Sequence, residues 1–412
     1  MVYIAILGHG VVGSGVVEVM LHNADNINSR VKEEIFIKHI LDLRSFPESP
    51  LASRFTTDFE NIINDSEIRI VVEVMGGVHP AYDFVKRCLL AGKSVVTSNK
   101  ELVAVKGAEL IRVASENNVN FLFEASVGGG IPILRPLSQC LAANRVSEIA
   151  GILNGTTNFI LTKMIKEQVS FEDALAEAQS LGYAERDPAA DVDGHDACRK
   201  ICILAALAFG KHVYPEAVYT QGIRSVKLED VAYAENWGGV IKLIGLVREV
   251  ENGKLQICVA PMLVSRESQI ASVDGVFNGI KVNGDATGEI VFYGRGAGKL
   301  PTASAVVADI IDCVKHLSAR KYLFWEDCDG SNIESYSKDV TGMYFRFKGD
   351  KAKILADAEE RFGELKLLSR KGASEDEIAF VTTPHTIEEL ESFKAEQINQ
   401  GAELLGSIRL LA

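Results

Sequence analysis

The sequence lacks the features that would place it in several common classes of protein. Its seven cysteines lie at irregular spacings without a Cys-x-x-Cys pair, so neither a disulfide framework nor a zinc site is indicated. No apolar run approaches the roughly 20 residues of a membrane-spanning helix. The opening MVYIAILG has no basic leader, so no signal peptide is expected. Together these absences predict a protein of the reduced cytoplasm.

Positive charge is also scarce. The 412 residues include 43 Lys and Arg against 56 Asp and Glu, which gives a net charge of −13. Nucleic acids and acidic membranes attract basic surfaces, so we expect neither as a partner. With 47% hydrophobic residues, the chain is long enough for two or three domains with substantial cores.

A glycine-rich turn follows the first apolar run. Residues 2–7 predict a buried strand, and the turn Gly8-His9-Gly10-Val11-Val12-Gly13 opens a helix that continues to about His22. This G-x-G-x-x-G pattern between strand and helix is the fingerprint of a dinucleotide site, where the pyrophosphate lies at the helix N-terminus. The candidate cofactor-binding residues here are Gly8, Gly10, Val11, Val12 and Gly13.

Strands and helices then alternate, which predicts an α/β domain with a doubly wound parallel sheet. The expected strands are 35–41, 68–74, 94–97 and 119–123, and the expected helices lie near 80–91 and 101–117. Ligands of such sheets bind beyond the carboxyl ends of the strands. Gly76, Ser98 and Lys100 lie at such ends and are candidate cofactor-binding residues. For Lys100 the alternative is a solvated helix cap.

The preference for NAD or NADP stays open. Asp42 closes the second strand and could bind a ribose hydroxyl. It lies farther along the chain than the roughly 20 residues expected after the glycine turn, because of a segment at 23–33 that we expect to be a loop. Arg44, two residues later, could instead contact a 2′-phosphate.

The densest group of charged residues is LGYAERDPAADVDGHDACRK at 181–200. We expect a loop first and a helix from about Asp193, because Gly and Pro give way to an apolar stripe. Asp196 and Lys200 then share one helix face. A lysine beside a carboxylate can transfer a proton, and Glu185 could hold a cationic group of the substrate. The alternative is an ordinary surface ion pair.

Two more segments bring polar groups or glycines to the ends of elements. EASVGGGIP at 124–132 has three consecutive glycines, which indicates either close backbone approach to a ligand or a sharp turn between domains. GILNGTTNFIL at 151–161 ends a strand on Asn154-Gly155, with Thr156 or Thr157 expected to cap the next helix. Asn154, Gly155 and Thr156 are candidate substrate-binding residues.

The remaining patterns complete the domain prediction. We expect an antiparallel sheet between 240 and 292, a glycine-rich loop at 293–301, a helix near 302–316, and a polar linker at 319–340. The last stretch reads β-α-β-β-α-β, a ferredoxin-like unit. The predicted domains are residues 1–130 completed by a helix at about 302–318, a substrate-binding and dimerisation α+β domain at 131–301, and a regulatory domain at 341–412.

The chain resembles the homoserine dehydrogenase family along nearly its whole length. The resemblance rests on GHGVVGSGVV, EVMGG, TSNKELVA, EASVGGGIPI, GILNGTTNFIL, LGYAERDPAADVDGHDACRK and YGRGAGKLPTASAV in this order. It implies reversible interconversion of L-aspartate 4-semialdehyde and L-homoserine with NAD or NADP, in the route to threonine, methionine and isoleucine. Two alternatives are a nicotinamide-dependent sensor without catalysis and another two-domain amino-acid dehydrogenase.

The resemblance also implies residue roles. Lys200 matches the family's proton-transfer lysine, Asp196 its carboxylate neighbour, and Lys100 a lysine near the reacting centre. Glu185 matches the residue that binds the amino end of homoserine, and Asp191 another carboxylate of the substrate pocket. Gly296 matches a loop that closes over the cofactor. A sodium site, bound largely through backbone carbonyls, matches Glu124, Val127, Gly129 and Ile131.

The terminal unit resembles an ACT domain, which implies an amino-acid effector such as threonine. The usual Asp-x-Pro-Gly turn of such domains is replaced by residues 349–353, GDKAK. Leu41 stands where NADP-preferring relatives often carry an arginine. The resemblance further implies a homodimer or homotetramer.

Overall fold

A computed structural model describes residues 1–319 and 323–411, apart from the side chain of Asn252. The chain divides into two compact units. Part of the predicted linker, residues 320–322, and Ala412 at the end of the predicted regulatory domain lie outside the described residues. The first unit comprises Met1–Val146, Cys202–Pro215 and Gly294–Gly330, and the second comprises Ser147–Ile201, Glu216–Tyr293 and Ser331–Ala412.

The first unit is built on a parallel sheet with the strand order β3-β2-β1-β4-β5-β6. The order reverses between β1 and β4, which is the switch point of a doubly wound sheet. The predicted Rossmann-type fold is thus confirmed. The strands are β1 (Val2–Leu7), β2 (Ile35–Leu41), β3 (Phe55–Thr56), β4 (Ile68–Glu73), β5 (Ser94–Thr97) and β6 (Phe121–Leu122).

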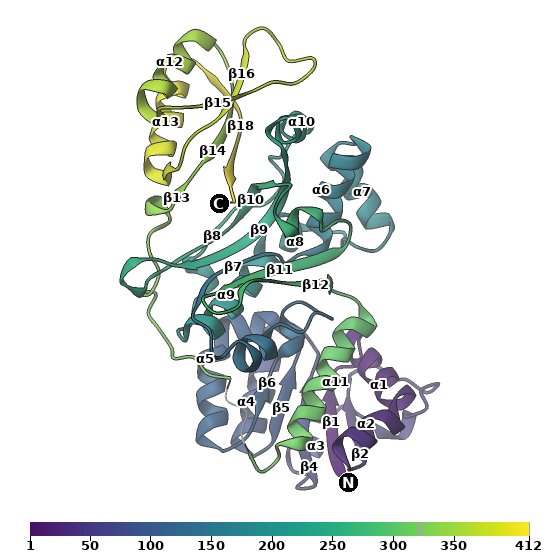
Figure 1. The fold of residues 1–412 in the computed structure, drawn as a ribbon. Coiled ribbons are helices and arrows are strands. Elements are labelled where there is room, and N and C mark those ends of the chain that lie inside the picture. Colours follow the sequence, from purple (N-terminus) through teal and green to yellow (C-terminus); the bar gives the residue numbers. More distant parts are fainter. Residues whose placement is uncertain (320–322, 412) are drawn as a thin grey trace. The chain divides into compact units, whose positions relative to one another are not determined.

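Helices complete this unit, and one of them comes from far along the chain. α11 lies beside α1 (Figure 1), and its buried Ala303, Val306 and Ile310 join the same core as Ile4 and Ile6 of β1. The helices are α1 (Val11–His22), α2 (Ala24–Val31), α3 (Glu60–Ile63), α4 (Ala81–Leu90), α5 (Lys100–Glu116) and α11 (Lys299–Lys315).

The expected loop at 23–33 is wrong, because this segment forms α2. Its Asn, Asp and Ser residues favour turns and caps over helix interiors, which hid the helix in the sequence. Ile27 and Val31, four residues apart, nevertheless share a face and pack on the core of the sheet. Tertiary packing therefore overrides the local composition.

The second unit contains one long mixed sheet, with the order β12-β11-β7-β9-β10-β18-β14-β16-β15 and β8 paired with β10. β9 and β10 are antiparallel, as predicted, but β8 and β18 run parallel to β10. The strands are β7 (Val146–Ile152), β8 (Tyr219–Thr220), β9 (Gly239–Glu249), β10 (Leu255–Ser265), β11 (Phe277–Gly284), β12 (Gly288–Arg295), β14 (Met343–Lys348), β15 (Lys366–Leu368), β16 (Glu377–Val381) and β18 (Glu403–Leu410).

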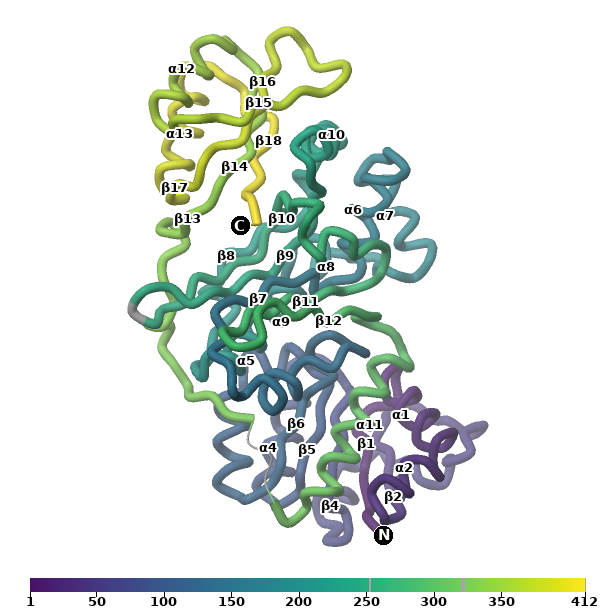
Figure 2. The backbone as a smooth tube through the Cα atoms, viewed as in Figure 1, coloured from purple at the N-terminus to yellow at the C-terminus, as the bar shows by residue number. Residues whose placement is uncertain are grey.

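The antiparallel pairing expected between 240 and 292 is confirmed for β9 and β10, and the two parallel strands come from outside that range. β18 joins β10 through Met262 opposite Arg409 and Leu263 opposite Leu410 (Figure 2). The central sheet and the C-terminal strands form one continuous hydrogen-bonded structure.

The C-terminal strands follow the order β18-β14-β16-β15, with two helices on one face (Figure 1). This order is that of a ferredoxin-like unit, in agreement with the predicted β-α-β-β-α-β succession. Phe345, Phe347, Phe380 and Phe393 fill the core between sheet and helices. The elements are α12 (Lys351–Phe362), α13 (Ile387–Asn399), and a separate pair β13 (Val340–Thr341) and β17 (His385–Thr386).

The remaining helices of the second unit carry the candidate substrate residues. The apolar stripe predicted after residue 193 is buried in α9, where Ala197, Ile201, Leu204 and Ala205 are at most 1% exposed. The loop predicted ahead of it contains the one-turn helix α8. The helices are α6 (Gly155–Glu167), α7 (Phe171–Ser180), α8 (Ala189–Val192), α9 (His195–Phe209) and α10 (Leu228–Trp237).

The domain boundaries drawn from the sequence stay predictions. Within the predicted linker, however, some side chains are buried. Trp325 is 2% exposed and donates a hydrogen bond from Nε1 to His212 Nδ1 at 2.9 Å. A Cβ on Gly107 would lie 2.7 Å from Trp325 Cζ2, so the indole packs directly on α5. The segment around Trp325 is packed into the first unit.

Candidate active site

The glycine turn between β1 and α1 has the geometry that its sequence predicts. Gly8 adopts φ +99°, and a Cβ on Gly13 would lie 2.0 Å from Gly8 O, so helix and turn meet too closely for any side chain. A Cβ on Gly10 would contact nothing within 4 Å. Gly10 caps α1 without a side chain, so the backbone N–H groups of the helix start face an open approach for an anion.

Asp42 directly follows β2 and is held as a carboxylate. Its oxygens accept hydrogen bonds from His9 N at 2.8 Å, and from Arg44 N, Nε and Nη2 at 2.9–3.0 Å. The Arg44 guanidinium holds the pKa of Asp42 far below its usual range. The two candidates for cofactor discrimination are therefore paired with each other.

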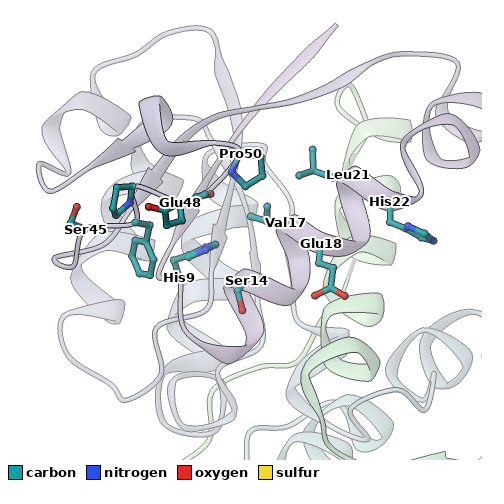
Figure 3. A pocket seen from close by; sticks show the side chains of 12 residues that line it. His9, Ser14, Val17, Glu18, Leu21, His22, Ser45, Glu48 and Pro50 are labelled. Carbon is teal, nitrogen blue, oxygen red and sulfur yellow. The ribbon is translucent and has the colours of Figure 1, made fainter.

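Two cavities adjoin this turn. One of about 510 Å³ is lined by Gly8, Gly10, Asp42 and Arg44 together with the apolar Phe59 and Phe84. Another of about 820 Å³ lies between α1 and the loop at 45–50, with His9, Val17 and Glu48 around the same space (Figure 3). Four of the candidate cofactor residues, Gly8, Gly10, Asp42 and Arg44, line the first cavity, and nothing in the sequence pattern indicated the second.

The ends of β4 and β5 place Gly76, Ser98 and Lys100 at the carboxyl edge of the sheet. Lys100 is the first residue of α5, and Asn99 caps this helix by accepting a hydrogen bond from Leu102 N at 3.1 Å. Ser98 and Lys100 are half-buried. Lys100 is thus the first residue of α5, one position before the helix expected at 101–117.

The segment from Glu124 to Gly130 is a compact turn. Glu124 Oε1 accepts from Ile133 N and Leu134 N, and Oε2 accepts from Arg135 N, at 2.7–2.9 Å. A Cβ on Gly129 would lie 2.4 Å from Gly296 O, so the loop of Gly296 packs on this turn. The Glu124 carboxylate thus fixes the backbone of residues 133–135 to the turn.

Sequence reasoning missed Asp309, which supports this turn from α11. It is fully buried, accepts from Glu124 N at 2.8 Å, and pairs with Arg135 Nη2 at 2.5 Å. Burial and the neighbouring Glu124 raise the pKa of Asp309 to about 8. Its only signal in the sequence was an Asp, followed three residues later by Asp312, in an otherwise apolar helix stretch.

Asn154, in the second unit, joins two carboxylates. Its Nδ2 donates to Asp191 Oδ1 at 2.7 Å and to Asp196 Oδ2 at 2.9 Å. Its Oδ1 accepts from Thr157 N at 2.9 Å, so Asn154 is the N-cap of α6. The expectation that Thr156 or Thr157 caps this helix is wrong, because the cap is Asn154 and the helix already begins at Gly155.

Lys200 is buried beside these carboxylates. Its Nζ donates to Asp196 Oδ2 at 2.7 Å and to Leu153 O at 2.8 Å. Lys200 is 7% exposed and Asp196 3%, so the i,i+4 pair is not the solvated surface pair that was the alternative. Such a buried amine, held by one carboxylate and one carbonyl, can give or take a single proton.

Asp191 completes the polar cluster of Asn154, Asp191, Asp196 and Lys200. Burial, and then the negative charge of Asp196, raise the pKa of Asp191, while the Asn154 amide opposes the rise. Two neighbouring carboxylates favour a cationic ligand, such as an ammonium group, because it relieves their repulsion.

The other substrate candidates are placed differently. Thr156 Oγ1 donates to Tyr183 O at 2.7 Å, which ties the 181–188 loop to α6. A Cβ on Gly155 would lie 2.8 Å from Val276 O. Glu185 is exposed on the loop, whereas the residues of the polar cluster are buried or half-buried. Hydrogen bonds therefore join four of the predicted residues, Asn154, Asp191, Asp196 and Lys200.

The described residues contain no group of three or more His, Cys, Asp or Glu that could hold a metal ion. No helix among them is long and apolar enough to cross a membrane. A doubly wound sheet with this glycine turn, together with a buried amine and carboxylate in the second unit, defines a nicotinamide-dependent oxidoreductase.

Comparison with known proteins identifies the family. The model of the homoserine dehydrogenase NAD-binding domain matches residues 8–124, and the homoserine dehydrogenase model matches residues 132–311. The chain therefore belongs to the homoserine dehydrogenase family, and it binds a nicotinamide cofactor.

Individual relatives agree over most of the chain. The homoserine dehydrogenase of Synechocystis sp. is 46% identical over 320 residues, which cover 76% of this chain and 73% of that one. The Bacillus subtilis enzyme is 39% identical over 93% of this chain and 92% of its own. The crystal structure of a homoserine dehydrogenase from Thiobacillus denitrificans has a TM-score of 0.91 at 37% identity, covering 100% of this chain and 98% of that one.

Proposed function

We propose that Lys200 performs the proton transfer of the homoserine dehydrogenase reaction in this chain. The observation that carries this assignment is the buried hydrogen bond between Lys200 Nζ and Asp196 Oδ2. In reduction of L-aspartate 4-semialdehyde, Lys200 donates a proton to the aldehyde oxygen, which becomes the hydroxyl of L-homoserine. In oxidation, the neutral amine takes that proton back. The bound nicotinamide supplies or takes up the hydride.

The neighbours of Lys200 orient the amine and the substrate. Asp196 and the Leu153 carbonyl fix the direction of the amine, and Asn154 fixes Asp196. Asp191 offers a negative charge to the ammonium group of homoserine, and Glu185 joins it when the 181–188 loop closes. Lys100 supports the reacting centre from the start of α5.

We infer that the chain prefers NAD to NADP. Asp42 is ionised and fixed by His9 N and Arg44, and its Oδ atoms suit a ribose hydroxyl donor. A 2′-phosphate would meet that negative charge, while the Arg44 guanidinium is engaged by Asp42. Leu41 adds no positive charge. Gly76, Val12 and Gly296 complete the proposed cofactor contacts.

A sodium ion at the turn 124–131 would be bound largely through backbone oxygens. The carbonyls of Glu124, Val127, Gly129 and Ile131 would hold it, because hard oxygen ligands suit such a cation. The left-handed Gly128 and Gly129 give this turn a shape that few other residues adopt. The ion would be structural, stabilising the turn on which Gly296 packs.

Regulation and assembly follow from the family likeness. The ferredoxin-like unit would bind an amino-acid effector such as threonine, and the protein would form a homodimer or homotetramer in the cytoplasm. In the altered turn, Asp350 Oδ1 accepts from Lys353 N at 3.2 Å and caps α12. Asp350 thus supplies a helix cap where relatives use proline and glycine. Light scattering measures the mass of the assembly, and a change of that mass on addition of threonine would indicate that the effector binds.

A spectrophotometric assay tests the function directly. Purified protein with L-homoserine should reduce NAD, with a higher kcat/KM than for NADP. Binding of cofactor without turnover of homoserine would favour the sensor alternative. Turnover of other amino alcohols in preference to homoserine would favour a different amino-acid dehydrogenase.

A further inference from the structure

Glu73, the last residue of β4, is a completely buried carboxyl group with no role in the assignments above. Its Oε1 accepts hydrogen bonds from Met75 N at 2.8 Å and Gly76 N at 3.3 Å, and its Oε2 accepts one from Thr97 Oγ1 at 2.6 Å. Burial raises the pKa of Glu73, and these donors oppose the rise. Glu73 therefore gathers groups from the ends of two neighbouring strands.

The contacts of Glu73 continue into a closed ring through Asn99. Thr97 Oγ1 accepts from Asn99 N at 2.9 Å, and Asn99 Nδ2 donates to Gly77 O at 2.6 Å. Asn99 Oδ1 also caps α5 through Leu102 N. The loop after β4 and the start of α5 are thus fixed to one another by side chains rather than by the sheet.

This ring lies at the carboxyl edge of the sheet, next to the glycine turn. A Cβ on Gly8 would lie 3.0 Å from Met75 Cγ and 3.2 Å from Met75 Cα. In the strand order β2-β1-β4-β5, Asp42 follows β2, whereas Glu73 and Thr97 end β4 and β5. A doubly wound sheet binds its dinucleotide across the switch point, so we expect the nicotinamide half to lie over the carboxyl ends of β4 and β5.

We propose that Glu73 is a positioning residue for the nicotinamide half of the cofactor. It holds the loop at Met75–Gly77 and the start of α5, with Lys100, in one fixed arrangement. Glu73 is covered by protein and acts through the backbone N–H groups of Met75 and Gly76 and the hydroxyl of Thr97. The inference rests on the proposed function in one respect, that the nicotinamide half lies over the ends of β4 and β5.

Lys93 provides a matched control, because it lies at the amino ends of β4 and β5, whereas Glu73 lies at their carboxyl ends. It is 4% exposed and donates from Nζ to Asp65 O at 2.6 Å and Ile68 O at 3.1 Å. Like Glu73, it ties together loops beside β4 and β5, but far along the strands from the glycine turn. Lys93→Met should lower thermal stability and leave cofactor binding unchanged.

The test compares Glu73→Ala, Glu73→Gln and Lys93→Met by calorimetric titration with NAD in the absence of homoserine. Loss of three hydrogen bonds from the loops should weaken NAD binding at least about tenfold in Glu73→Ala. Glu73→Gln should stay within about threefold of wild type, because an amide oxygen accepts from both N–H groups and its NH₂ donates to Thr97. In turnover, the KM for NAD should rise more than the KM for homoserine.

Wild-type NAD affinity in folded Glu73→Ala would overturn the proposal, as would equal weakening in Lys93→Met. If Glu73→Ala does not fold, Thr97→Val removes the bonds to Glu73 and Asn99 with little change of shape. Several-fold weaker NAD binding then supports the proposal, and unchanged binding overturns it. Because the titration needs no turnover, its outcome is separate from that of the homoserine assay.

Discussion

Lys200 Nζ lies 2.7 Å from Asp196 Oδ2, and both side chains are buried within the second unit. Removing one partner of such a pair leaves an uncompensated charge, whereas exposed pairs of the same spacing contribute little. Mutation of either partner is therefore expected to lower stability as well as activity.

Lys200→Met should lower kcat for homoserine oxidation at least about 100-fold, the size expected for acid–base catalysis. NAD binding should remain, because the glycine turn is untouched. Lys163→Met is the control, since this partly exposed lysine also has an i,i+4 carboxylate, Glu167. Near-normal turnover of Lys200→Met would exclude Lys200 as the proton carrier.

In wild type, oxidation of homoserine should speed up from neutral to alkaline pH, because the amine of Lys200 must be neutral to accept the proton.

Asn154→Ala should lower both stability and activity. The substitution removes the cap of α6, which costs about 1 kcal/mol. It also removes the amide that joins Asp191 to Asp196. Asp350→Ala, which removes the cap of α12, is the matched control and should lose a similar free energy of unfolding by urea titration. Only Asn154→Ala should also raise the KM for homoserine, by about tenfold or more. Equal kinetics in the two variants would contradict the bridging role.

Replacing Asp42 should change cofactor preference. Asp42→Ser removes the fixed negative charge and releases Arg44, so the ratio of kcat/KM for NAD to that for NADP should fall at least about tenfold. Asp25→Ser, an exposed carboxylate on α2, should leave the ratio as it is. The measurement is initial rate at varied NAD and NADP with saturating homoserine. A wild-type preference for NADP would refute the inferred role of Asp42.

Asp42 should also contribute to stability at low pH. Its pKa is lower in the folded state than in the unfolded chain, where an aspartate titrates near about 4. Its contribution is therefore fully present above pH ~4 and is lost as the pH falls below that value. Wild type should exceed Asp42→Asn by about 1 kcal/mol at pH 7, allowing for solvent screening. Urea unfolding at pH 7, 4 and 3 should show this difference shrinking; a constant difference would contradict it.

The local patterns of the sequence predicted a large part of this structure. The glycine turn has one steric solution, and the spacing of Asp196 and Lys200 fixes their helix face wherever the helix packs. Relations between distant segments could not be predicted in the same way. Glu73 meets Thr97 only because β4 and β5 are neighbours, and Asn154 meets Asp191 and Asp196 only through folding.

The same limit explains the corrections. Val31 and Ile27 form a helix face in α2 that their polar neighbours conceal. The cap of α6 falls on Asn154 rather than on the threonines because both kinds of side chain suit an N-cap, and only the backbone decides between them.

The parallel pairing of β18 with β10 has a consequence for biosynthesis. The edge of β10 is complete once Ser265 has been made, but its partner, Glu403–Leu410, emerges from the ribosome only much later. Until then the backbone groups of Met262 and Leu263, beyond the part of this edge that pairs with β8, are open to strands of other nascent chains. The protein therefore passes through a period of exposure to aggregation during each round of synthesis, and its yield in cells should depend on chaperones that shield this edge.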